Sequence, residues 1–145
     1  MLTRDPMRFK KIGVTPEEAS YYAFIGNTLE RIGDHAVVIA KKVSVLMDKE
    51  LDERVVKAIV SASATSLGVL TRSIDSWFNM DLDAANDNIE SLNKLYPVLE
   101  KINRIAVEAD GTPCVEVCYV IESIRRTGEY SCNISEFAID KVLYE

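Results

Sequence analysis

Residues 29–43 read LERIGDHAVVIAKKV and place acidic and imidazole side chains around a glycine in a long segment of helical periodicity. Glu30, Asp34 and His35, the chain's single histidine, are types that bind metals or exchange protons. A helix places Glu30 and Asp34 side by side, because they are four residues apart. Such a pair is either solvated or shares a cation, and hard cations, iron and zinc accept carboxylate oxygens.

Gly33 needs a physical reason, because a glycine in a helix interior costs about 1 kcal/mol relative to alanine. Gly26 lies one heptad earlier and Ala40 one heptad later, which predicts a stripe of small residues. This stripe would let another helix or a bound ion approach closely. His35 flanks the apolar seam of the helix, where a role in helix packing or at the surface is more common than metal ligation.

Four segments carry helical periodicity, over residues 16–47, 52–78, 82–109 and 113–143. Thr15, Pro16 and Glu18 form a capping box with a proline at the first helical position, and Asp81 suits an N-cap. Pro97 is expected to kink the third helix, because it cannot donate to a carbonyl in the preceding turn. The sequence 110–113, DGTP, predicts a helix stop followed by a new start.

The first two helices have apolar seams that predict a packed face. These seams are Tyr22, Ile25, Leu29, Ile32, Ala36, Ile39, Val43 and Leu46, and then Val56, Val60, Ser63, Leu67, Leu70, Ile74 and Trp77. Connections of a few residues make successive helices antiparallel. The predicted fold is therefore an all-α, antiparallel helical bundle of four long helices.

The composition limits the classes of function. The 145 residues have a net charge of -6, which argues against nucleic-acid contact by this chain. A basic arm over residues 1–14 precedes a predicted bundle over 15–145. No stretch approaches the roughly 18 apolar residues of a membrane span, so no membrane insertion is expected. Three cysteines without a C-x-x-C pair favour a reduced, cytoplasmic location, with Cys114 and Cys118 as small buried side chains.

The chain also contains a weak internal sequence repeat. Shifted by 95 residues, the opening segment lies over IRRTGEYSCNISEFA, residues 124–138. Gly33 then meets Gly128, and Asp34 meets Glu129. A repeat whose units each end in one such helix would explain this alignment.

These residues resemble a known family. LERIGDHA closely resembles the signature of the PhoU family of phosphate-uptake regulators, and CNISEFA (132–138) resembles the tail of that family's second signature. FNMDLDAA (78–85) is similar to the family's turn between the hairpin helices of the second repeat, and KIGVTPEEA (11–19) is most similar to the archaeal branch. The resemblance covers the chain from about residue 12.

The resemblance implies two three-helix repeats whose E/D-x-x-x-D motifs hold iron or zinc, with no catalysis. It also implies that the protein dampens phosphate import by contacting the phosphate ABC transporter and its sensor kinase. Glu30 and Asp34 match the first motif. In the second, Arg125 stands where Glu is expected and Glu129 where Asp is expected. Arg125 would repel a metal beside Glu129, and the two side chains can pair at i, i+4 instead.

Other positions depart from the family pattern. Ser91, Leu92 and Tyr96 stand where members tend to have carboxylates, and only about 14 residues precede the first motif helix. The chain therefore resembles one motif helix plus one complete repeat, as in an engineered fragment or the C-terminal part of a longer protein. A metal at Glu30 and Asp34 would then need ligands from another chain, because these ions take four or more ligands.

Three functions follow from this interpretation. The first is a non-catalytic PhoU-like regulator, homodimeric, with a transporter ATPase or sensor kinase as partner. The second is an iron- or zinc-binding bundle, and the third is an oligomerisation or effector domain of a transcription regulator. An enzyme is not expected, since the sequence has no Gly-rich phosphate loop, no nucleophile–base motif and no E-x-x-H signature.

Overall fold

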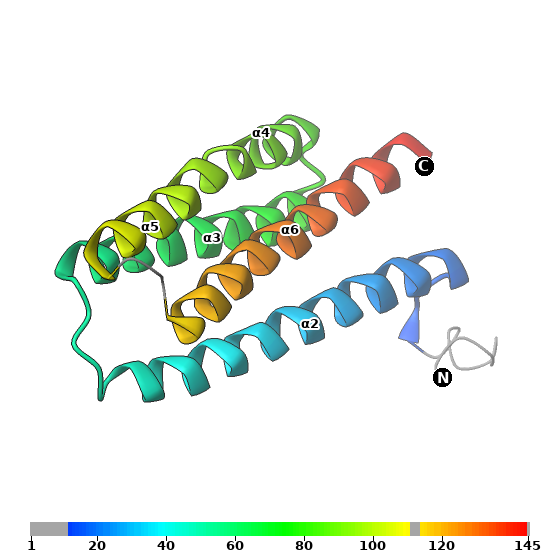
Figure 1. Cartoon of the computed structure of the whole chain (residues 1–145). Helices are drawn as coiled ribbons and strands as arrows, with labels where there is room; N and C mark the ends of the chain where they lie inside the picture. Colours follow the sequence, from blue (N-terminus) through cyan, green and yellow to red (C-terminus); the bar gives the residue numbers. More distant parts are fainter. Residues whose placement is uncertain (1–11, 111–113, 145) are drawn as a thin grey trace.

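The computed structural model describes residues 12–110 and 114–144, and within these ranges the chain is helical with no strand (Figure 1). The helices are α2 (Pro16–Leu46), α3 (Glu53–Asn79), α4 (Leu82–Leu92), α5 (Leu95–Asp110) and α6 (Val115–Tyr144). The predicted all-α antiparallel bundle is confirmed. Most of the predicted basic arm and residues 111–113 of the predicted DGTP turn lie outside the described residues.

The predicted helix starts are present as hydrogen bonds. The Glu18 N–H donates to Thr15 Oγ1 at 3.1 Å, and the Thr15 N–H donates to Glu18 Oε2 at 2.8 Å. The Ala84 N–H donates to Asp81 Oδ1 at 3.0 Å, which makes Asp81 the N-cap of α4. These local signals therefore set the beginnings of α2 and α4 as the sequence predicted.

The third predicted helix is two helices, and its expected continuity over residues 82–109 is wrong. α4 ends at Leu92 and α5 begins at Leu95. At the break, the N–H groups of Asn93 and Lys94 each donate three residues back, at 3.1 Å. Pro97 follows as the third residue of α5, where its missing N–H leaves the Asn93 carbonyl without a helical donor. The proline therefore separates two helices rather than kinking one.

α6 is the central helix of the bundle. It contacts each of the other four described helices, whereas α2 packs against α6 alone (Figure 1). One apolar cluster, which includes Leu95, Ile102 and Ile124, joins α3, α5 and α6. A second, around Trp77 and Ile134, lies near the carboxyl end of α3. The face of α2 that is turned away from α6 therefore has no helix beside it among the described residues.

The prediction that the two apolar seams are packed is wrong in large part. α3 instead buries a face rich in small residues, namely Val55, Ala62, Ser66, Val69, Ser73, Ser76 and Trp77. Val60 and Leu67 of its predicted seam are 63% and 55% exposed. On α2, Ile32 is buried, but Leu29 and Val43 are exposed. Small side chains let α3 approach α4, α5 and α6 closely, which turns its larger apolar residues outward.

α3 bears on the expectation that no segment inserts into a membrane. It is the one helix among the described residues that is long and apolar enough to cross a bilayer, as judged from its most apolar window of 18 residues. The helix packs against α4, α5 and α6, yet only 22% of that window is buried.

Candidate functional site

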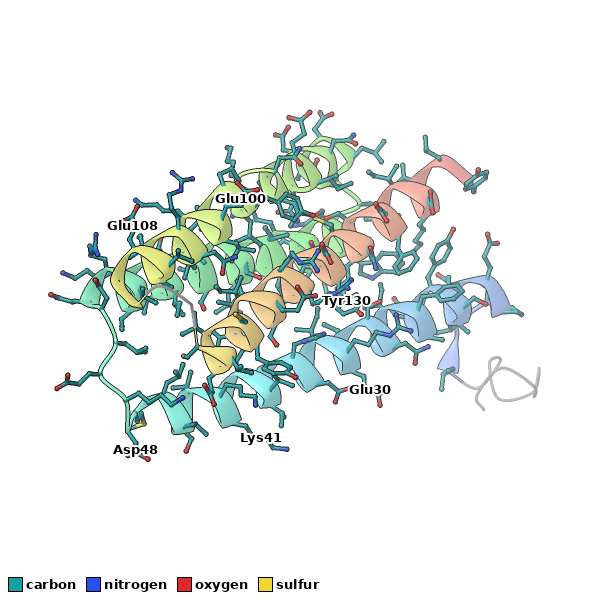
Figure 2. All side chains as sticks on the ribbon, in the orientation of Figure 1. Glu30, Lys41, Asp48, Glu100, Glu108 and Tyr130 are labelled. Carbon is teal, nitrogen blue, oxygen red and sulfur yellow. The ribbon has the colours of Figure 1, made fainter. Side chains whose placement is uncertain are left out.

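The first acidic motif lies on the outer face of α2. Glu30 and Asp34 are both exposed, and together with Asn27 and Arg31 they line a shallow open hollow of about 320 Å³. Glu30 points away from α6 (Figure 2). Within the described part of the chain, neither carboxylate forms a hydrogen bond or an ion pair. Both are therefore available to a group outside the chain.

The hollow does not contain a complete set of metal ligands. Its oxygen donors are two carboxylates and the Asn27 amide, and the Arg31 guanidinium lines the same hollow. Iron and zinc take at least four ligands, and a nearby cation opposes metal binding. The described residues contain no group of three or more His, Cys, Asp or Glu side chains arranged to hold a metal ion. A metal at Glu30 and Asp34 would need ligands from another chain.

His35 serves helix packing, as predicted from its position beside the seam. Its Nδ1 lies 3.3 Å from Ser123 Oγ on α6, and its ring lies 5.8 Å from the Tyr130 ring. The Arg31 guanidinium lies 5.6 Å from the same tyrosine ring. The half-buried imidazole therefore joins α2 to α6.

The acidic residue of the second motif, Glu129, is paired with arginines. The predicted pair is confirmed, with Arg125 Nη1 at 3.2 Å from Glu129 Oε1. Arg126 Nη1 lies 3.3 Å from the other Glu129 oxygen, and the Tyr96 hydroxyl donates to Glu129 at 3.3 Å. Glu129 thus meets two guanidinium groups and a phenol, which leaves it poorly placed to bind a metal.

Glu122 completes this cluster, although the comparison of the two acidic motifs in the sequence gave it no role. It pairs with Arg125 at 2.7 Å and with Arg126 at 2.9 Å. Partial burial opposes ionisation of Glu122, but hydrogen bonds from both arginines outweigh it and hold its pKa below the ordinary value. Partial burial, with the charge of Glu129, raises the pKa of Tyr96. The phenol therefore stays protonated and donates to the carboxylate.

The two glycines of the repeat have different surroundings. A Cβ on Gly128 would lie 2.8 Å from Leu95 Cδ2 and 3.0 Å from Leu92 Cδ1, so this glycine permits close packing of α6 against α4 and α5. A Cβ on Gly33 would meet nothing within 4 Å. The described part of the chain therefore contains no close contact at Gly33, where one was predicted, whereas Gly128 has such a contact without having been predicted to.

Replacing Gly33 with alanine is expected to raise the free energy of unfolding of the isolated chain by about 0.5–1 kcal/mol, because alanine favours the helix and meets no steric contact. Urea unfolding of dilute protein measures this difference. Val37→Ala, an exposed change one turn later on α2, also raises helix propensity and controls for a general gain of this kind. A lower stability for Gly33→Ala would mean that the glycine has an intramolecular role.

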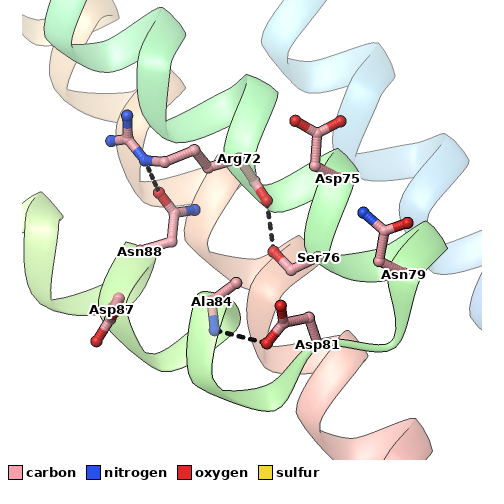
Figure 3. A pocket seen from close by; sticks show the side chains of 8 residues that line it. All are labelled: Arg72, Asp75, Ser76, Asn79, Asp81, Ala84, Asp87 and Asn88. Carbon is pink, nitrogen blue, oxygen red and sulfur yellow. Dashed lines mark hydrogen bonds between the residues drawn. The ribbon is translucent and has the colours of Figure 1, made fainter.

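A polar hollow at the turn between α3 and α4 is a second candidate site (Figure 3). It has a volume of about 260 Å³, and its lining residues are Arg72, Asp75, Ser76, Asn79, Asp81, Ala84, Asp87 and Asn88. Arg72 Nε donates to Asn88 Oδ1 at 3.0 Å, and Ser76 Oγ donates to the Arg72 carbonyl. Together with Asp81, which caps α4, the side chains of Arg72, Ser76 and Asn88 therefore stabilise the turn.

Asn88 is the residue that sequence reasoning missed. It is 1% exposed, and its amide nitrogen lies 2.9 Å from the Val69 carbonyl, 2.7 Å from Ser73 Oγ and 3.1 Å from Ser135 Oγ. The network ties α4 to α3 and α6. The sequence does indicate that Asn88 is buried, because it lies three residues after Ala85, on the apolar side of the helix.

The cysteines differ from expectation in one case. Cys118 is exposed and Cys114 is half-buried, so the prediction of two buried thiols is wrong for Cys118. Cys132 is the buried one, and burial raises the pKa of its thiol to about 11. Its thiol therefore stays protonated at neutral pH.

Comparisons with protein family models, with curated proteins and with solved structures find no match for this chain. The resemblance to PhoU therefore stands on its quoted motifs. What these motifs do depends on the geometry of α2 and α6.

Proposed function

We propose that this chain is a non-catalytic, PhoU-like regulator of phosphate uptake that docks on a transporter ATPase or a sensor kinase in the cytoplasm. The supporting observation is the contrast between the two acidic motifs. Glu129 is neutralised by Arg125 and Arg126, whereas Glu30 and Asp34 are exposed and unpaired among the described residues. The first motif thus keeps the carboxylates that the family resemblance assigns to it.

The chemistry of the pair favours a cationic partner surface. Like charges at i, i+4 on a helix repel each other by about 0.2–0.5 kcal/mol. A lysine or arginine of another protein would relieve this repulsion and would steer the encounter. The adjacent Arg31 lies over the Tyr130 ring and lines the same hollow, so the two carboxylates outnumber the one cation beside them.

The test is binding of the purified chain to the phosphate transporter ATPase and to the sensor kinase of its own source organism. The double variant Glu30→Gln/Asp34→Asn is expected to weaken binding about tenfold or more, with the loss smaller at high salt. The matched control is Asp83→Asn/Asp87→Asn, a second exposed carboxylate pair at i, i+4, on α4. The control is expected to bind as the parent chain does.

Two results would count against this function. One is equal binding by the two double variants, which would remove the role of Glu30 and Asp34. The other is a gene deletion that leaves phosphate uptake unchanged, together with no binding to either partner. The second result would overturn the proposal as a whole.

Iron or zinc binding at Glu30 and Asp34 is the second candidate function, favoured by the Asn27 amide in the same hollow. Elemental analysis of the purified chain beside Glu30→Ala/Asp34→Ala tests it. Near-stoichiometric metal in the parent alone would support a site completed by ligands from another chain. No metal in either would leave the pair as a protein-docking surface.

A further inference from the structure

α2 and α3 together present a broad uncharged face to solvent. On α2 the exposed residues Leu29, Gly33, Ala36, Val37, Ala40, Val43, Ser44 and Met47 form one side of the helix, and none is charged. On α3 the exposed residues Val56, Val60, Ala64, Leu67, Thr71 and Phe78 lie on one side of the helix, and the exposed acids Glu53 and Asp75 border this set. We call these two sets the α2–α3 face. Such continuous apolar exposure on a protein surface marks an interaction site.

A groove runs along this face between the two helices. It has a volume of about 390 Å³, and its lining is almost entirely apolar, with Ile32, Ala36 and Val43 from α2 and Leu67 from α3. Ile124 and Thr127 of α6 are also among its lining residues. A second set of apolar side chains would therefore find both a groove to enter and two flanking helices to cover.

The buried side of α3 supports the same conclusion. The helix buries Ser66, Ser73 and Ser76 and exposes Val60, Leu67 and Phe78 at 63%, 55% and 72%. An apolar side chain left in water forgoes about 1.5–3 kcal/mol relative to full burial. Burial against another molecule would recover this for several residues at once.

We propose that the α2–α3 face is the interface of a homodimer, in which a second copy of this chain packs its own α2–α3 face against the first. The dimensions fit a second copy. The α2 set begins at Leu29 and the α3 set ends at Phe78, and each spans about 30 Å at 1.5 Å per residue. Two helices about 10 Å wide then give a footprint of about 600–700 Å² on each copy, close to the roughly 800 Å² that each partner buries in a stable complex.

The chemistry of the face also fits a second copy. The chain has a net charge of -6, so two copies repel each other, and acids within the contact surface would add to that repulsion. The acids Glu30, Glu53 and Asp75 lie at the edges of the α2–α3 face, and its centre offers no charged group with which to select a basic or acidic partner. A two-fold axis pairs the same patch with itself and needs no further complementarity. Gly33 then has a role, since it lets the backbone of a facing helix approach α2.

The experiment is analytical ultracentrifugation of the full chain from about 1 to 100 µM, with vesicle flotation on the same protein. We expect a concentration-dependent species of twice the 16.2 kDa chain mass. Val37→Lys and Leu67→Lys are each expected to weaken the dimer at least tenfold, because either would place an ammonium group in the apolar contact. Both residues are more than half exposed, at 52% and 55%, so the variants are expected to fold, which circular dichroism checks.

Val45→Lys is the matched control. Val45 is 44% exposed and lies on the opposite flank of α2, outside the α2–α3 face. This variant is expected to dimerise within twofold of the parent chain. A monomer at 100 µM, or a dimer that Val37→Lys and Leu67→Lys leave intact, would overturn the proposal. Flotation with vesicles by a monomeric chain would overturn it in favour of a membrane surface.

Discussion

Replacing Asn88 with alanine is expected to lower the free energy of unfolding by about 2–4 kcal/mol. The side chain is 1% exposed and supplies the hydrogen bonds that join α4 to α3 and α6. Removing a buried partner leaves polar groups without their bonds, at about 1–3 kcal/mol for each group. The Val69 carbonyl keeps a bond from Ser73 at 2.9 Å, which limits the loss. Urea unfolding followed by circular dichroism measures the change.

The control is Asn86→Ala, an exposed asparagine two residues earlier on the same helix. It is expected to change stability by less than about 0.5 kcal/mol. If Asn88→Ala and Asn86→Ala had the same effect, the network would contribute nothing to the fold. The tie between α4 and the rest of the bundle would then have to come from apolar packing alone.

Asn88, Ser73 and Ser135 form one hydrogen-bonded network, so the stability losses caused by their substitution are expected to be coupled. Ser135 Oγ donates to Ser73 Oγ at 3.0 Å, so the two hydroxyls remain paired after Asn88 is removed. Removing all the members of a polar cluster can cost less than removing one, because no buried group is then left unpaired. The triple variant Ser73→Ala/Asn88→Ala/Ser135→Ala should therefore lose less than the sum of the three single variants. Additive losses would show that the three side chains act independently.

Local signals account for what the sequence predicted well. The capping box at Thr15 and the N-cap at Asp81 involve residues three positions apart, so neighbouring residues decide them. The Arg125–Glu129 pair is one turn of one helix, and the exposure of Glu30 and Asp34 follows from their place on the face away from the seam. None of these features depends on which helix lies beside which.

Contacts between helices account for what the sequence did not predict. Periodicity shows that α3 has an apolar face, but the choice of the buried face depends on how closely α4, α5 and α6 can approach. Ser66 illustrates this, since its hydroxyl donates to the Ile124 carbonyl on α6 at 3.0 Å and makes a buried serine acceptable. The same holds for Tyr96, which reaches Glu129 across 33 positions of sequence.

Leu95→Ala is expected to lower the free energy of unfolding by about 2–5 kcal/mol, because it deletes a fully buried side chain at the start of α5. The same leucine lies where a Cβ on Gly128 would come within 2.8 Å of it. Gly128→Ala alone is expected to cost about 1–2 kcal/mol, since overpacking costs more than the roughly 1 kcal/mol that alanine gains in the helix.

The double variant Leu95→Ala/Gly128→Ala tests whether these two residues define the closest approach of α5 to α6. In the Leu95→Ala variant, the methyl group added at residue 128 enters the space that the truncated side chain has left. Gly128→Ala should therefore be neutral or stabilising in that variant. The coupling energy is expected to be about 1–3 kcal/mol by urea unfolding. Leu143→Ala, at an exposed site on α6, is the control with little expected effect. Additive losses would place the steric limit elsewhere, at Leu92, whose Cδ1 would lie 3.0 Å from the same Cβ.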